Sequence, residues 1–434
     1  MMKRTSGIGR LLAVLLPVLL LRQIATADIY TNPRTADIPT LIKALEDANV
    51  RQGASIALAR LGRSTVPALR KTLAGDKGDL RLWTAYTLGK IGPGAAAAVP
   101  ELTQALSAKD ASLRAVAARS LGQIGVMAGS AVPTLAETLR DKDQRVRRFS
   151  AIALGRIGPA ASRAVPKLIR SLKVPGLRTT ARDALIRIGR PALPALQNVL
   201  TDNAVRFDAI STIRQIDPQA ARRDGIAKPT AADLPALRIV LLDTGRSVAD
   251  RRVAATALGS LGPAAIAPLI AAFSAEAVSQ SASAAVGRIG VTAVPQLVKA
   301  LADDRAAVRA TAADALAAIG PPAHRAVKGL IAAFKDRDRT VRHRAVLAVD
   351  AFGPSAAEAV PALIVVVNNP RDREETRQAA LKALVRTGEP KSRSAVVEAL
   401  IHASQNRRNF GISSLARQLV RKLDPTAAAK AGIK

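Results

Sequence analysis

A short phrase recurs along this chain at a nearly constant spacing, and this recurrence restricts the folds open to it. The phrase reads AVPELTQAL at Pro100, AVPTLAETL at Pro133 and AVPKLIRSL at Pro166, so the commonest spacing is 33 residues. Self-similarity at such a period is typical of repeat architectures, in which each repeat is one supersecondary unit. Further starts of the same kind bring the number of units to about twelve: Pro39, Pro67, Pro194, Pro235, Pro268, Pro295, Lys328, Pro361 and Val397.

One unit, residues 130–158, indicates what each repeat folds into. Pro133 is placed in the first turn of a first helix, where a missing N–H costs nothing. Apolar residues then recur at helical spacing until the polar turn around Asp143, which we expect to cap a second helix. The second helix ends in the phrase ALGRIG, in which Gly158 before a proline is typical of a helix C-terminus. Each unit is therefore predicted to be a helical hairpin.

A single hairpin of this size cannot bury both of its apolar stripes, so the units must stack on one another. The sequence therefore predicts an all-α solenoid of about twelve helical hairpins. The spacing stretches between Pro194 and Pro235, where the polar segment from Asp217 to Asp233 contains two prolines and indicates a joint. The expected organisation is a signal peptide (1–27), an N-terminal array (28–217), a linker (218–232), a C-terminal array (233–424) and a tail (425–434).

The first 27 residues have the layout of a secretory signal peptide. Lys3, Arg4 and Arg10 form a basic start, residues 11–21 are apolar, and Ala25-Thr26-Ala27 is a small-x-small site. The apolar stretch is shorter than the roughly 20 residues that a membrane span needs. We expect an extracytoplasmic protein, secreted or periplasmic, without a transmembrane span in the mature chain; the alternative is a protein anchored by an uncleaved signal.

The composition indicates an anionic partner. The formal charge is +32, and removing residues 1–27 takes away four basic residues and no acid, which leaves +28. A net charge of this size favours binding to polyanions. The chain contains no cysteine, which excludes disulfides, thiolate nucleophiles and zinc–cysteine sites.

The phrases AVPxL and VRxxAAxALGxIG resemble those of the HEAT-repeat family, and in particular its short bacterial subtype named after phycobilisome lyases. The resemblance extends over roughly residues 37–424 and implies a right-handed α-α superhelix. The family includes scaffolds, bilin lyases and deoxyhypusine hydroxylases, so its motifs indicate a fold more than a function.

The sequence indicates no catalytic residue, cofactor or metal site. Hydroxylases that resemble this fold hold iron with His-Glu pairs, and this chain has no His-Glu dipeptide. Its histidines, His324, His343 and His402, fall in three different units and favour isolated, solvated side chains over metal ligands. A bilin lyase-like or oxidoreductase-like enzyme remains the alternative, although the export signal and the scarcity of aromatic residues count against it.

One set of arginines occupies the same place at the start of the second helix in ten units. In HEAT arrays this arginine and the preceding turn aspartate resemble an internal ladder that bonds adjacent repeats, so we assign them to stability. The predicted ladder consists of Arg51, Arg81, Arg114, Arg147, Arg178, Arg206, Arg251, Arg309, Arg342 and Arg377, with Asp141, Asp303 and Asp336 standing six residues before their arginines.

A second set of basic residues stands nine positions further along, at the variable letter of LGxIG. Nine residues turn a helix through about 900°, a net half turn, so these side chains cannot share the face of the ladder. Aligned in a regular array, they form a row of positive charge that either binds an anionic partner or only complements the helix C-termini and solubilises the surface. This basic row consists of Arg60, Lys90, Arg156, Arg187, Arg288, Arg386 and Lys422.

The leading hypothesis is a non-catalytic extracytoplasmic scaffold whose basic surface binds an acidic protein or an anionic envelope polymer. Nucleic-acid binding is permitted by the charge but disfavoured by the export signal and by the lack of aromatic residues for stacking.

Overall fold

The computed structural model describes residues 29–388, 390–406 and 409–433, and these residues contain helices and no strands. The predicted signal peptide lies outside the described residues. The chain forms two compact units, of which the first ends at Ala227 and the second begins at Lys228. That division falls inside the segment 218–232 that the sequence marks as a joint.

The first unit contains six helical hairpins among its described residues. Its first helices are α2 (Ile38–Ala44), α4 (Val66–Leu73), α6 (Val99–Ala105), α8 (Val132–Glu137), α10 (Val165–Ser171) and α12 (Leu193–Asn198). Its second helices are α3 (Arg51–Leu61), α5 (Gly78–Ile91), α7 (Ala111–Ile124), α9 (Gln144–Ile157), α11 (Arg178–Ile188) and α13 (Arg206–Ile216).

The second unit repeats this arrangement with six further hairpins. Its first helices are α15 (Leu234–Leu242), α17 (Ile266–Ala271), α19 (Val294–Ala300), α21 (Val327–Ala333), α23 (Val360–Asn368) and α25 (Arg393–Ser404). Its second helices are α16 (Val248–Gly259), α18 (Glu276–Ile289), α20 (Ala306–Ile319), α22 (Arg339–Phe352), α24 (Glu374–Thr387) and α26 (Phe410–Leu423). The prediction of an all-α repeat with about twelve hairpins is confirmed.

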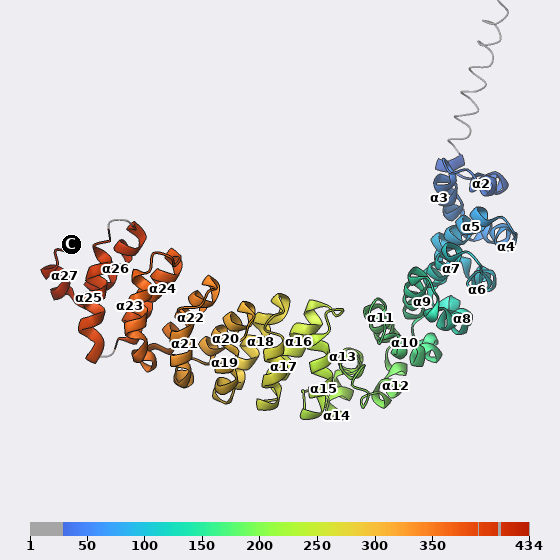
Figure 1. Cartoon of the computed structure of the whole chain (residues 1–434). Helices are drawn as coiled ribbons and strands as arrows, with labels where there is room; N and C mark the ends of the chain where they lie inside the picture. Colours follow the sequence, from blue (N-terminus) through green and yellow to red (C-terminus); the bar gives the residue numbers. More distant parts are fainter. Residues whose placement is uncertain (1–28, 389, 407–408, 434) are drawn as a thin grey trace, which may run out of the picture. The chain divides into compact units, whose positions relative to one another are not determined.

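Within each unit the hairpins stack so that like helices lie side by side. In the first unit, α5, α7, α9 and α11 form one layer and α4, α6 and α8 form the other, as Figure 1 shows. The second helices contact one another most extensively, through the pairs α5 with α7, α7 with α9 and α9 with α11. The layer of second helices is therefore a continuous surface on which equivalent positions of successive repeats are neighbours.

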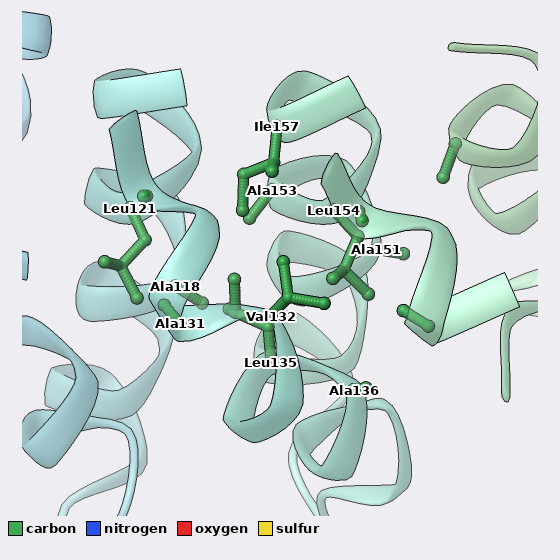
Figure 2. Packing of buried hydrophobic residues seen from close by; sticks show 14 of the residues in the cluster. Ala118, Leu121, Ala131, Val132, Leu135, Ala136, Ala151, Ala153, Leu154 and Ile157 are labelled. Atoms are coloured by element: carbon green, nitrogen blue, oxygen red, sulfur yellow. The ribbon is translucent and has the colours of Figure 1, made fainter. Parts of the chain in front are cut away.

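The core between the two layers is built from small aliphatic side chains. Figure 2 shows Val132 and Leu135 of α8 inserted between α7, with Ala118 and Leu121, and α9, with Leu154. All of these side chains are fully or almost fully buried. Because each first helix fills the gap between two second helices, no hairpin completes its core without a neighbour.

The expected ends of the hairpin formed by α8 and α9 are confirmed. Pro133 lies in the first turn of α8, and the Asp143 carboxylate accepts a hydrogen bond of 2.7 Å from the backbone N–H of Arg145 at the start of α9. Gly158 ends α9 with φ of 74° and ψ of −141°, a backbone conformation that L side chains rarely adopt. The recurring glycine is thus required by the turn that leads into the next hairpin.

A second glycine in the phrase LGxIG serves close packing instead. A Cβ atom built on Gly122 of α7 would lie 2.9 Å from the Cα of Ala153 in α9. Gly155 of α9 stands in the same relation to Ala184 of α11, again at 2.9 Å. Neighbouring second helices therefore approach through backbone contacts that any larger residue would push apart.

Each of the two compact units ends in a short helix that follows its last hairpin. In the segments assigned to the linker (218–232) and the tail (425–434), the structure has α14 (Pro218–Arg223) and α27 (Pro425–Lys430), which pack on α13 and α26. Both helices follow an Asp-Pro pair whose carboxylate, Asp217 or Asp424, accepts hydrogen bonds from backbone N–H groups of the first turn. Proline at the first helical position begins these helices and does not break the chain into a loop.

The two end helices also close in the same way. Gly225 and Gly432 both have φ of 69°, and the next residue, Ile226 or Ile433, donates its backbone N–H over 3.0 Å to the carbonyl of Ala221 or Ala428. This is the hydrogen bond of a Schellman motif. The common pattern DPxAAxxxGI therefore marks the end of both units.

One helical stretch of the described residues, Arg339–Asn368, is long and apolar enough to cross a membrane by length and composition. It comprises α22, a 3-10 turn (Gly353–Ala359) and α23, and Gly353 interrupts it with φ of 56°. Its large apolar side chains, such as Phe352 and Leu363, are fully buried in the hairpin core. The apolarity of this stretch thus serves packing between repeats.

Candidate binding surface on the second helices

The predicted ladder arginines all lie in the first turn of second helices. All of them except Arg51 donate hydrogen bonds to backbone carbonyls of residues shortly before that helix. Arg147 of α9 donates from Nη1 to the carbonyls of Asp141 and Lys142 at 2.7 and 2.9 Å. Arg178, Arg251 and Arg377 are buried and donate from Nε to the carbonyls of Leu172, Leu241 and Val367. These arginines close their own hairpins and are not available to a ligand.

The ladder arginines Arg114, Arg309 and Arg342 also bind an aspartate of the following repeat. Arg114 and Arg309 each hold one carboxylate with two hydrogen bonds, to Asp141 at 2.8 Å and to Asp336 at 2.7 Å. Arg342 donates from Nε to Asp372 at 2.5 Å. The hydrogen bond from Arg114 holds the pKa of Asp141 below its ordinary value, which keeps the pair ionised.

Two aspartates depart from the predicted pattern. The carboxylate of Asp303 accepts from Arg305, with 3.0 Å between Nε and Oδ1, because the preceding second helix, α18, has Ser279 at its fourth position, where α20 has Arg309. Asp372 joins the ladder although the spacing does not predict it, since it stands five residues before Arg377 and not six.

The predicted basic row is exposed at all seven positions, near the C-terminal ends of second helices. In the first unit, α3, α5, α9 and α11 carry Arg60, Lys90, Arg156 and Arg187. Helix α7 interrupts the row with Gln123. Because these helices form one layer, the side chains belong to one surface, which we call the basic surface of the first unit.

Two aromatic residues of α5 lie beside cations of this surface. Trp83 and Tyr86 of α5 meet edge to face with 5.3 Å between ring centroids. Arg51 lies over the Trp83 ring at 4.9 Å, while Lys90 and Arg119 lie near the Tyr86 ring at 5.6 and 5.8 Å. Cation–π contacts hold these cations in place without neutralising their charge.

In the second unit, a carboxylate neutralises the charge of one residue of the basic row, Arg386. In the first unit, two residues of the row have no such partner. Arg386 of α24 forms an ion pair with Asp350 of α22, 3.1 Å from Nη1 to Oδ2, and burial raises the pKa of Asp350 although Arg386 counteracts this effect. In contrast, the side chains of Arg156 and Arg187 form no hydrogen bond or ion pair with another described residue. The same holds for the side chain of Arg148, one turn into α9. Helices α9 and α11 therefore carry three arginines whose charge no described carboxylate compensates.

The three histidines lie in three different elements: His324 in the 3-10 turn Pro321–Ala326, His343 in α22 and His402 in α25. His324 and His402 are exposed, whereas His343 of α22 is half-buried and lies 3.2 Å from the Thr376 hydroxyl. Burial lowers the pKa of His343. Within the described part of the chain, no group of three or more His, Cys, Asp or Glu side chains is placed to hold a metal ion.

An apolar groove of about 540 Å³ lies on the first helices of the second unit. Ile331 of α21 and Pro361, Ala362 and Val365 of α23 form its wall, and Arg342 and Asp372 of the ladder lie at its end. Asp336, Arg342 and Asp372 of its lining are already engaged in the ladder.

Family comparisons agree with this geometry. A family model described as HEAT repeats matches residues 38–109, 99–186, 266–350 and 327–416, and a model described as PBS lyase HEAT-like repeat matches residues 250–275. These matches cover most of the chain. The chain belongs to the HEAT-repeat family. The resemblance noted from the phrases AVPxL and LGxIG is thereby confirmed, including the PBS lyase-like subtype.

No curated protein matches the sequence of this HEAT-repeat chain. Among solved structures, it is similar to an engineered protein, with 22% identity, a TM-score of 0.34, and coverage of 82% of this chain and 98% of that chain. Kap121p is 12% identical with a TM-score of 0.47, over 95% of this chain and 48% of Kap121p. Human deoxyhypusine hydroxylase in complex with glycerol is 24% identical with a TM-score of 0.24, over 68% and 97% of the two chains. This HEAT-repeat chain thus spans about half the length of Kap121p.

Proposed function

We propose that this HEAT-repeat protein is a non-catalytic scaffold that acts outside the cytoplasm and binds an acidic protein or an anionic envelope polymer. A HEAT-repeat solenoid is a scaffold fold typical of protein binding, because stacked repeats present extended surfaces. The observation that carries the proposal is the basic surface of the first unit, where Arg156 and Arg187 are exposed and no described carboxylate pairs with them.

The charge balance around this surface supports the choice of partner. Residues 151–200 contain nine Lys or Arg residues and a single acid, Asp183. The layout of residues 1–27 supports an extracytoplasmic location, and these residues lie outside the described part of the chain. Anionic surface polymers and acidic exported proteins are partners that such a charge attracts.

Binding of the purified protein to fluorescent polyglutamate at low and high salt tests the electrostatic part. We expect tight binding at low salt and a loss of about tenfold or more when the ionic strength rises to about 0.5 M, because exposed charges are screened. The double variant Lys90→Gln/Arg187→Gln should bind more weakly, whereas Arg386→Gln, whose charge is already paired with Asp350, should bind nearly as well.

A fusion of residues 1–30 to a reporter tests the location. Export of the reporter is the expected result. Retention in the cytoplasm would contradict the extracytoplasmic part of the proposal, and binding that is unchanged by salt would contradict the electrostatic part.

A further inference from the structure

A small hollow lies between α9 and α11, two second helices at one end of the basic surface of the first unit. It has a volume of about 200 Å³. Helix α9 contributes Arg148, Ile152 and Arg156 to its wall, and α11 contributes Thr180, Asp183 and Arg187. Drug-sized ligands occupy pockets of about 300–1,000 Å³, so this hollow suits one small chemical group and not a large organic molecule.

The hollow follows from the spacing of residues on the two helices. Arg148, Ile152 and Arg156 stand four residues apart on α9 and therefore share one face. Thr180, Asp183 and Arg187 line the facing side of α11 in the same way. Between them Gly155 allows the helix backbones to approach, so that Gly155 and Ala184 line the hollow together with the long basic side chains.

The lining of the hollow has the composition of an oxyanion site. Arg148, Arg156 and Arg187 supply three guanidinium groups, none of which forms a hydrogen bond or ion pair with the residues that the structure describes. Guanidinium groups bind phosphate and sulfate with paired N–H donors, and the Thr180 hydroxyl can add another donor. Apart from Asp183, no carboxylate lines the hollow.

We propose that this hollow binds a tetrahedral oxyanion, a phosphate or sulfate group, and that such a group on the anionic partner is what the scaffold recognises. The proposal rests on the proposed function, since it names the chemical group of the partner that the basic surface binds. Asp183 opposes the bound anion by charge repulsion and limits its affinity, so that a single free phosphate binds weakly and a partner that carries many such groups binds tightly.

Titration of the purified protein with inorganic phosphate, inorganic sulfate and glycerol phosphate, followed by calorimetry at low ionic strength, tests the site. Inorganic phosphate probes the free ion, and glycerol phosphate probes a phosphate ester such as a polymer or a lipid headgroup carries. We expect the variant Arg156→Gln/Arg187→Gln to lose affinity for phosphate by about tenfold or more, because two of the three guanidinium donors are removed. The variant Arg156→Lys keeps the charge but loses the paired donors, so its affinity for phosphate should fall by about threefold.

Two further variants make the result specific. Arg163→Gln removes an exposed charge of the same region that does not line the hollow, and it should leave phosphate affinity unchanged within about twofold. Asp183→Asn should increase phosphate affinity by several-fold, a gain that a misfolded variant cannot produce. Circular dichroism of each variant verifies the helical fold.

The outcomes separate this inference from the proposed function. No measurable phosphate or sulfate binding, or an equal loss in Arg163→Gln and Arg156→Gln, would overturn the oxyanion site. If polyglutamate binding persists in that case, the scaffold function stands without the site; if polyglutamate binding is also absent, both fail. Tighter binding of glycerol phosphate than of inorganic phosphate would support an ester as the natural ligand, and the reverse order would support the free ion.

Discussion

The guanidinium group of Arg114 and the carboxylate of Asp141 join two successive hairpins of the first unit. Two hydrogen bonds of 2.8 Å connect them, from Nε to Oδ2 and from Nη2 to Oδ1. The remaining nitrogen, Nη1, donates to the carbonyls of Ala108 and Lys109 at 2.9 Å. Both side chains are largely buried, with 16% and 11% of their surfaces exposed. One arginine therefore closes its own turn and holds the next repeat.

Replacing Arg114 by Met should destabilise the protein by about 2 kcal/mol, because Asp141 loses two charge-assisted hydrogen bonds in a partly buried place. Urea unfolding followed by circular dichroism measures the loss. The matched control is Arg145→Met, whose ion pair with Asp143 lies at the surface and within one turn, and which should have a much smaller effect. Equal effects of the two variants would mean that the ladder adds no particular stability.

Replacing Gly122 by Ala should destabilise the first unit by about 2 kcal/mol, although alanine is the better helix former. The added Cβ would lie 2.9 Å from the Cα of Ala153, so α7 and α9 would have to separate. Gly129→Ala is the control, since its Cβ would meet nothing nearer than the Ala160 Cβ at 3.9 Å. Thermal unfolding of both variants distinguishes close packing from propensity, and a more stable Gly122→Ala protein would refute this account.

Acid should weaken the ladder. The hydrogen bond from Arg114 lowers the pKa of Asp141 in the folded chain below its value in the unfolded chain. The stability from this group is therefore fully present above the unfolded pKa of about 4 and is lost as the pH falls through the lower, folded pKa. Urea midpoints between about pH 6 and pH 2.5 should fall more steeply for the natural protein than for Asp141→Asn. Parallel curves would contradict the assignment.

Replacing Gly225 or Gly432 by Ala should reduce stability by a similar amount. At both positions φ is 69° and no atom lies near the place of a Cβ, so replacement by Ala should cost about 1 kcal/mol through backbone strain alone. Gly78→Ala provides the control, because it has open space and no positive φ, and it should be neutral or slightly stabilising. Thermal unfolding measures all three. A large effect at only one of the two end glycines would show that the end helices do not play the same part in the two units.

The hairpins were predictable from the sequence because each depends on local signals that repeat. Pro133 begins a helix, Asp143 caps the next helix and Gly158 ends it. Every repeat buries the same kinds of small aliphatic residue. The ends of the two compact units were less predictable. The sequence predicts a linker from residue 218, since proline in a polar segment is common in loops, whereas in the structure Asp217 and Pro218 begin α14.

The sequence by itself determined that the chain is a stack of helical hairpins and which residues of each hairpin face the core, because these features follow from helical periodicity within about thirty residues. It also determined that the basic row recurs on the second helices. Only the tertiary structure decided which of these cations remain unpaired, since Asp350 reaches Arg386 from the neighbouring helix while no described acid pairs with Arg156 or Arg187. It likewise decided that Gly155 brings α9 and α11 together so that Arg148 joins Arg156 and Arg187 around one hollow. Contacts between repeats depend on how closely two helices pack, and no spacing within one repeat specifies that distance.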